Sequence, residues 1–146
     1  MSRIQFYHNT EDPLALACEL TTRAVAGGRR VALRMSDADA ARRIDQLLWS
    51  FDQLAFVPHV AVDSPLAGET PVVIAVAGAP APWPEHDLLF NLAEDVAADF
   101  AEFRTVVEIV GRDEASKQPA RARWMHYKQA GHPLKAFDSE RREAIA

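Results

Sequence analysis

The sequence has one cysteine and no long apolar run, which excludes several classes of protein. Cys18 is the single cysteine among 146 residues, so an internal disulfide is impossible and a cysteine-based zinc site is not indicated. Because it lies in the mostly apolar stretch 14–20, we expect a buried, inert thiol. No apolar segment reaches the roughly 18–20 residues of a membrane helix, and the N-terminus does not resemble a signal peptide. We therefore expect a cytoplasmic protein.

Glycine is also scarce, which argues against nucleotide binding. A dinucleotide site needs glycines after the first strand, where the backbone approaches the pyrophosphate. Here that turn, His8–Pro13, reads HNTEDP and contains two acidic residues and no glycine. None of the six glycines forms a phosphate-binding loop, and the G-x-S-x-G nucleophile turn is absent. We expect no cofactor.

Metal-binding and catalytic patterns are likewise missing from the sequence. No two histidines have the two-, three- or four-residue spacing that would place a pair of ligands on one helix. The five histidines are His8, His59, His86, His126 and His132. Nothing selects an acid–base pair from the many carboxylates. The sequence therefore predicts neither a metal site nor catalytic residues.

The chain does show the alternation of strands and helices that is typical of an α/β domain. About half of its residues are apolar, enough to bury one core. The predicted strands are residues 3–7, 30–34, 71–76, 88–92 and 103–110. The predicted helices are residues 13–26 after a Thr10 or Asp12 cap, 37–49 with Ser36 or Asp37 as the cap, a short turn at 94–100, and 116–131 with Ser116 as the cap.

These elements predict a single domain over residues 1–138. Its architecture is an open, mostly parallel sheet flanked by helices. The connections at residues 50–70 and 77–86 are expected to be loops. We expect residues 139–146 to form a frayed tail.

Positive charge is concentrated in one segment of an acidic protein. Residues 112–135 contain six Lys or Arg and two acidic residues, a net charge of +4, whereas the whole chain carries −5. A protein with this total charge repels nucleic-acid phosphates over most of its surface. We expect neither direct nucleic-acid binding nor membrane binding. The basic segment instead fits a discrete acidic partner such as a short acidic peptide.

Within this segment, residues 116–131 (SKQPARARWMHYKQAG) predict a helix with a cationic stripe. At 100° per residue, Lys117, Arg121, Trp124 and Lys128 fall within an arc of about 60°. Lys and Arg donate hydrogen bonds to carboxylates, and Trp offers an apolar surface. The stripe fits an acidic ligand with an aromatic or apolar end. The alternative is an ordinary solvated helix face.

Another side of this helix predicts a core contact. Ala120 and Tyr127 are expected to pack on the sheet, with Arg123 at the edge of that side and extending toward solvent. Trp124 lies off that side, so it is less suited to an ordinary core position. A large apolar group among cations favours a binding role.

A second group of bulky apolar residues lies where the predicted helix 37–49 passes into a loop. It comprises Leu48, Trp49, Phe51, Phe56, Val57, Pro58 and His59. Two interpretations are open: Trp49 and Phe56 cover the sheet edge from inside, or they form an exposed patch that docks another protein. His59, beside Pro58, suits a structural role in the loop.

In order, spacing and total length, these segments resemble the chi subunit family of bacterial DNA polymerase III over about residues 3–138. The markers are FYH in the first strand, LW…F…FVPH, AGE at 67–69, PVVIA, LLFNL, and VVEIV…D…SKQPARARWMHYKQAG. The resemblance implies a Rossmann-like fold without nucleotide and an accessory subunit without polymerase activity. It also implies two partners. One is the acidic C-terminal tail of single-stranded DNA-binding protein, which ends in Asp residues and Pro-Phe; the other is the psi subunit, which attaches chi to the clamp loader.

The resemblance places the tail-binding site on the basic helix. Its positions correspond to Lys117, Arg121 and Trp124, with the two cations holding carboxylates and Trp124 receiving the terminal Phe. Trp124 stands where a tyrosine is common in the family. Met125 occupies a position where a base would strengthen the site, and Lys128, one turn further along, can substitute for that base.

The psi contact corresponds to Trp49 and the segment Phe56–His59, and a repair helicase is an alternative partner for the same surface. Two interpretations from other classes stay open. One is a small α/β enzyme acting on an anionic metabolite at the basic helix, which predicts a deep pocket with a titratable residue of perturbed pKa. The other is an interaction module unrelated to replication. The replication adaptor predicts peptide binding that weakens with salt and requires the terminal Phe.

Overall fold

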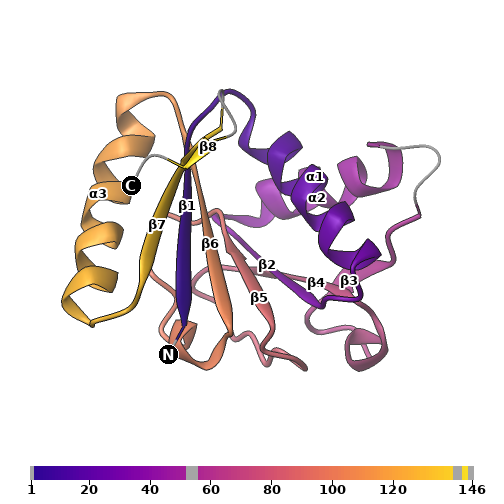
Figure 1. The fold of residues 1–146 in the computed structure, drawn as a ribbon. Coiled ribbons are helices and arrows are strands. Elements are labelled where there is room, and N and C mark those ends of the chain that lie inside the picture. Colours follow the sequence, from indigo (N-terminus) through magenta and orange to yellow (C-terminus); the bar gives the residue numbers. More distant parts are fainter. Residues whose placement is uncertain (1, 52–55, 140–142, 145–146) are drawn as a thin grey trace.

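An eight-stranded sheet runs through the centre of the molecule, with helices on both faces (Figure 1). The computed structural model describes residues 2–51, 56–139 and 143–144. The strands are β1 (Arg3–Thr10), β2 (Val31–Met35), β3 (His59–Ala61), β4 (Val72–Val76), β5 (Leu88–Asn91), β6 (Thr105–Gly111), β7 (Leu134–Asp138) and β8 (Glu143–Ala144). The helices are α1 (Pro13–Ala26), α2 (Ala38–Ser50) and α3 (Glu114–Gln129), with two short 3₁₀ turns, η1 (Ala67–Glu69) and η2 (Phe100–Glu102).

The strand order confirms the expected α/β class. It is β3-β4-β2-β5-β6-β1-β7-β8, and each neighbouring pair is parallel except the antiparallel pair β7–β8. Parallel strands need crossover connections, and the three long helices supply three of these connections. None of the described helices is long and apolar enough to span a membrane.

Alternating side chains on the strands separate two apolar cores. Ile4 and Phe6 of β1 point to the face covered by α3. The opposite face is covered by α1 and α2 (Figure 1), and Cys18 of α1 and Ile44 of α2 are buried there. Cys18 is buried as expected, and burial raises the pKa of its thiol to about 12, which opposes formation of the reactive thiolate.

Aspartates cap the first two helices. The Oδ1 atom of Asp12 accepts a hydrogen bond from the Ala15 N–H at 3.2 Å, and that of Asp37 accepts one from the Ala40 N–H at 2.8 Å. The Asp12 carboxylate therefore lies at the amino end of α1, where dinucleotide-binding folds place a phosphate. A negative charge at this point opposes phosphate binding.

Helix α3 begins two residues earlier than the sequence predicted. The Ser116 cap is wrong, because Asp113 is the N-cap residue: its carboxylate accepts hydrogen bonds from Ser116 N–H at 3.2 Å and Ser116 Oγ at 2.7 Å. Pro119 therefore lies in the second turn rather than the first. It removes the N–H that would have bonded to the Ala115 carbonyl.

The elements that the sequence missed are short and lie at or near the sheet edges. β3 and η1 fall within the predicted 50–70 loop, β7 follows the last helix, and the helical turn expected at 94–100 is instead η2. Short edge strands carry too few residues for a clear alternation, so their pairing with a neighbour decides them. Ser139 donates its N–H to the His8 carbonyl at 2.9 Å. Most of the predicted tail at 139–146 lies outside the described residues.

Candidate functional site

The predicted cationic stripe lies along an open groove beside α3. The groove has a volume of about 520 Å³ and is bounded by α3 together with β1, β6 and β7. The residues that line it are Phe6, His8, Asn9, Val110, Lys117, Ala120, Arg121, Trp124, Met125 and Ala136. Four of the five predicted tail-site residues thus share one groove. Lys128 is exposed on the same helix but does not line it.

The apolar floor of the groove comes from residues that the sequence analysis did not select. Phe6 of β1 is in register with Ala136 of β7, and the short Ala136 side chain leaves space next to α3. Val110 of β6 and Ala120 of α3 complete the floor. The alternation in β1, which puts Phe6 and His8 on the same face, was the available sequence signal. Ala136 carried none because β7 was not predicted.

Trp124 forms part of the groove wall and is anchored by the core. Its ring packs edge-to-face on the Phe6 ring, with centroids 5.1 Å apart and planes at 67°. The side chain is half-buried, so part of its surface stays available to a ligand. Met125 beside it is exposed. Trp124 is therefore both a core-edge residue and a member of the groove.

An acidic side chain lies close to both groove cations. The Glu114 carboxylate is 3.9 Å from Lys117 Nζ and 3.9 Å from Arg121 Nη1. All three side chains are solvent-exposed, so each ion pair contributes only about 0–1 kcal/mol. A ligand carboxylate can therefore compete with Glu114 for these cations. The sequence analysis missed this acid, which lies one turn before Lys117.

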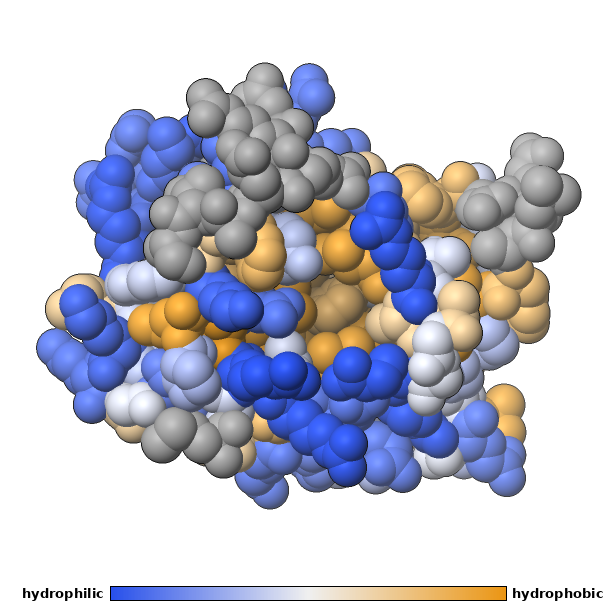
Figure 2. Space-filling model, viewed as in Figure 1, coloured by the Kyte–Doolittle hydropathy of each residue, from blue (hydrophilic) through white to orange (hydrophobic). Residues whose placement is uncertain are grey.

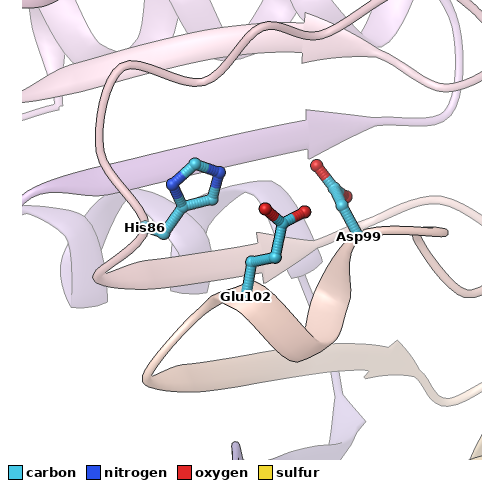
Figure 3. A group of neighbouring side chains, drawn as sticks. All are labelled: His86, Asp99 and Glu102. Carbon is cyan, nitrogen blue, oxygen red and sulfur yellow. The ribbon is translucent and has the colours of Figure 1, made fainter.

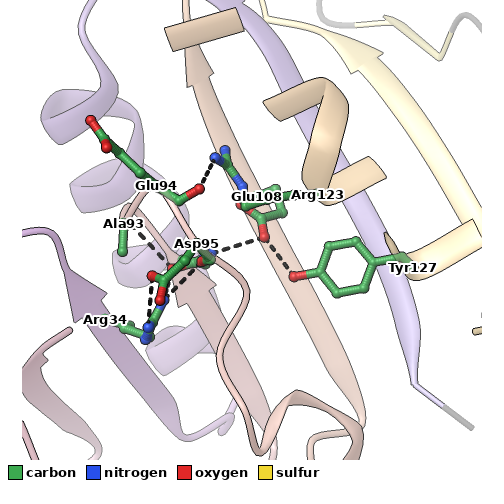
Figure 4. A network of polar contacts seen from close by, with 8 residues as sticks. Arg34, Ala93, Glu94, Asp95, Glu108, Arg123 and Tyr127 are labelled. Atoms are coloured by element: carbon green, nitrogen blue, oxygen red, sulfur yellow. Dashed lines mark hydrogen bonds and ion pairs between the residues drawn. The ribbon is translucent and has the colours of Figure 1, made fainter. Parts of the chain in front are cut away.

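A buried polar network fixes the other side of α3 to the sheet (Figure 4). The predicted extension of Arg123 toward solvent is wrong: only 5% of the residue is exposed, and its Nε donates to Glu108 Oε1 at 2.9 Å. Tyr127 donates its hydroxyl to the same carboxylate at 2.6 Å, and Asn91 donates its amide at 2.9 Å. Arg123 also donates to the Glu94 carbonyl at 2.8 Å. Three donors thus satisfy one carboxylate in the middle of the sheet.

Burial dominates the electrostatics of this network. It raises the pKa of Glu108, while Arg123, Asn91 and Tyr127 act in the opposite direction by stabilising the carboxylate. Burial and the nearby Glu108 charge raise the pKa of Tyr127, so its hydroxyl remains a donor. Every polar group here is engaged within the fold, which gives the network a structural role in orienting α3.

The second predicted surface is partly exposed. The exposed fractions are 57% for Trp49, 43% for Phe51 and 70% for Phe56. The Trp49 and Phe56 rings lie 5.5 Å apart between centroids, so they form one patch. Figure 2 shows hydrophobic surface at this end of the molecule. Exposure of this size favours the docking interpretation over an inward-facing cover.

The other members of that group lie beneath the aromatic patch. Leu48 and Val57 are buried in the core on the α1 and α2 face, and Pro58 is half-buried. The His59 ring is buried against Trp49, with centroids 4.7 Å apart. Its Nδ1 lies 2.7 Å from the Val57 carbonyl and its Nε2 lies 3.2 Å from Asp45 Oδ1. These contacts hold the loop under the patch.

Comparison with known proteins gives consistent similarity over nearly the whole chain. Residues 1–135 match the family described as DNA polymerase III chi subunit, HolC. The chain is 34% identical to DNA polymerase III subunit chi of Pseudomonas aeruginosa over 138 residues, which are 92% of this chain and 94% of that protein. It is 32% identical to the Escherichia coli subunit over 125 residues, 82% and 80% of the two chains. The Haemophilus influenzae subunit is 29% identical over 134 residues, 89% and 92%.

Proposed function

The chain belongs to the DNA polymerase III chi subunit family, and from this premise we propose that its α3 groove binds the acidic C-terminal tail of single-stranded DNA-binding protein. The protein is then a non-catalytic accessory subunit that links the clamp-loader complex to coated single strands. It acts in the cytoplasm, where the bacterial replication machinery works. The observation that carries the proposal is a groove lined by two cations, Lys117 and Arg121, and by the aromatic side chains of Phe6 and Trp124.

The chemistry of the groove suits both parts of such a tail. Lys117 and Arg121 donate charge-assisted hydrogen bonds to the Asp side chains and the terminal carboxylate. The Phe side chain at the end of the tail enters the apolar part, against Trp124 and Phe6. The basic helix on an acidic body also accelerates the encounter with an acidic peptide.

A labelled peptide with the tail sequence of the organism's own single-stranded DNA-binding protein should bind saturably in a fluorescence-anisotropy titration. A peptide that lacks the final Phe is the matched control and should bind much more weakly, because it leaves the apolar groove unfilled. Affinity should fall as salt rises, since the Debye length shortens to about 10 Å at 0.1 M salt. Equal binding of the two peptides, or no binding at low salt, would reject the proposal.

Replacing Glu114 with Gln should tighten tail binding by about 0.2–1 kcal/mol, which is up to about fivefold in Kd. The substitution removes a carboxylate that competes for Lys117 and Arg121. The same titration measures the effect, and Glu85→Gln on an exposed loop is the control for a change in overall charge. A weaker complex after Glu114→Gln would show that Glu114 supports the cations rather than competing for them.

The aromatic patch formed by Trp49, Phe51 and Phe56 fits a second protein partner. We propose the psi subunit of the clamp-loader complex, with a repair helicase as the alternative partner of the same surface. The patch is distinct from the α3 groove, because the helices that carry the two surfaces lie on opposite faces of the sheet (Figure 1). One molecule can therefore hold the tail and the second partner together.

Replacing Trp49 with Ala should weaken psi binding by about 2 kcal/mol or more, as is usual for an exposed Trp at the centre of an interface. Isothermal titration with purified psi subunit measures the loss, and titration with the helicase tests the alternative. Leu66→Ala removes another exposed apolar side chain outside the patch and should change neither affinity. If Trp49→Ala abolished tail binding as well, in a protein that is still folded, the two surfaces would not be separate.

A further inference from the structure

Three potential metal ligands converge at the end of the sheet where β5 and β6 begin. His86 precedes β5, Asp99 directly precedes the η2 turn, and Glu102 is the last residue of η2, which lies before β6. One ligand atom from each side chain lies within 4.8 Å of the others. Figure 3 shows the imidazole and the two carboxylates extending toward one common space.

The two segments that carry these side chains are held firmly in place. Phe100 in η2 and Phe103 directly after it are buried, and the Ser2 hydroxyl donates to the Phe103 carbonyl at 2.6 Å. The His86 ring packs edge-to-face on Phe103, with centroids 5.0 Å apart. The His86 carbonyl accepts a hydrogen bond from the Arg104 N–H at 3.2 Å. A preformed backbone therefore presents the three ligands.

Within the part of the chain that the structure describes, no hydrogen bond or ion pair engages the side chains of His86, Asp99 and Glu102. Two carboxylates this close repel each other, and a divalent cation between them would replace that repulsion by attraction. His86 and Asp99 are half-buried and Glu102 is exposed, so a cation from solvent can reach all three side chains.

We propose that His86, Asp99 and Glu102 bind a divalent transition-metal ion, for which Zn²⁺ is the best fit. Zn²⁺ takes both imidazole and carboxylate ligands, whereas Mg²⁺ and Ca²⁺ take oxygen ligands and would leave the imidazole unused. Zinc bonds of about 2.0–2.1 Å place tetrahedral ligand atoms about 3.3 Å apart. The ligand atoms lie within 4.8 Å of one another, so side-chain rotations that bring them closer by up to about 1.5 Å close the site. Water completes the coordination.

The ion would join the loop before β5 to the turn before β6 and so stabilise the fold. This role does not depend on peptide binding, because the groove beside α3 includes Val110 near the opposite end of β6. The sequence did not indicate this site, because His86 lies in a proline-rich loop thirteen residues before Asp99 and the ligands therefore form no local pattern.

Zinc affinity of the full, untagged chain should be measured by competition with a chromogenic chelator, and Co²⁺ absorption should report the ligand geometry. We expect one equivalent of zinc, a Co²⁺ spectrum of low-symmetry four-coordination, and a rise in Tm on adding zinc. His86→Ala should weaken zinc binding at least about tenfold. Asp99→Asn and Glu102→Gln should each weaken it in proteins of unchanged circular dichroism.

His126→Ala is the matched control, because it removes another histidine near Phe100 that does not belong to the cluster. Its zinc affinity should equal that of the parent protein. Failure to bind zinc at micromolar concentrations would overturn the proposal. So would parental affinity in His86→Ala together with Asp99→Asn, since zinc would then bind elsewhere. If the His86→Ala variant does not fold, the Asp99→Asn and Glu102→Gln variants still test the proposal.

Discussion

Replacing Glu108 with Leu is expected to lower the free energy of unfolding by about 3–5 kcal/mol. Glu108 is fully buried and accepts hydrogen bonds from Asn91, Arg123 and Tyr127. Leu has a similar volume, so the loss comes from the three donors and not from a cavity. The largest part arises because the Arg123 guanidinium is left buried without a counter-charge. Urea unfolding followed by circular dichroism measures the change.

The double variant Glu108→Leu with Arg123→Leu separates this cause from others. Removing both charges together eliminates the uncompensated cation, so the double variant should recover a large part of the lost stability. Additive losses from the two single variants would contradict the argument. A loss below about 1 kcal/mol in Glu108→Leu alone would show that water or another group satisfies Arg123.

Replacing Arg121 with Ala should cost about 1–3 kcal/mol of tail binding, which raises the peptide Kd about 5- to 150-fold. The Arg121 side chain is largely exposed and lines the groove, and its ion pair with Glu114 is long at 3.9 Å. Its loss should therefore leave the thermal stability nearly unchanged. Fluorescence anisotropy with the tail peptide and a thermal melt give the two values.

Two other cations are the controls for this result. Lys128 lies on the same helical stripe but outside the groove, so Lys128→Ala should weaken binding much less than Arg121→Ala. Arg42, exposed on α2, should have no effect on tail affinity when replaced by Ala. Equal losses for Arg121 and Lys128 would show that the stripe binds through its overall charge. Normal binding of Arg121→Ala would remove the groove as the site.

The sequence predicted the α/β architecture well because strong local signals agree with the fold. A continuous apolar run such as PVVIAV has apolar side chains on both faces of its strand, and a strand inside a parallel sheet is covered on both faces. Asp12 and Asp37 are good N-caps, and each was one of the two cap candidates that the sequence offered for its helix. The cationic stripe on α3 also needed only the helical period, since Lys117 and Arg121 are one turn apart.

Boundaries and short elements depended on weaker signals. Both Asp113 and Ser116 are good N-cap residues, and the sequence does not decide between them. In the fold, Asp113 accepts from the backbone and from the hydroxyl of Ser116, so the helix begins earlier. β7 has five residues and pairs along its whole length with β1, and only its last two residues also pair with β8, so its stability comes mainly from a partner more than a hundred residues away.

Only the tertiary structure could decide which of these residues meet. A charged residue such as Arg123 is expected at an exposed position of a helix. In the structure it is buried, because Glu108 on β6 accepts a hydrogen bond from its guanidinium. The groove exists because β7 places Ala136 beside Phe6, next to the helix that carries the stripe. The cluster of His86, Asp99 and Glu102 joins a loop to a turn across the sheet end. Helix caps, strand patterns and the cationic stripe depend on residues that are close together in the sequence, so they can be inferred from it. Long-range proximity follows from strand order, which burial of the whole core selects.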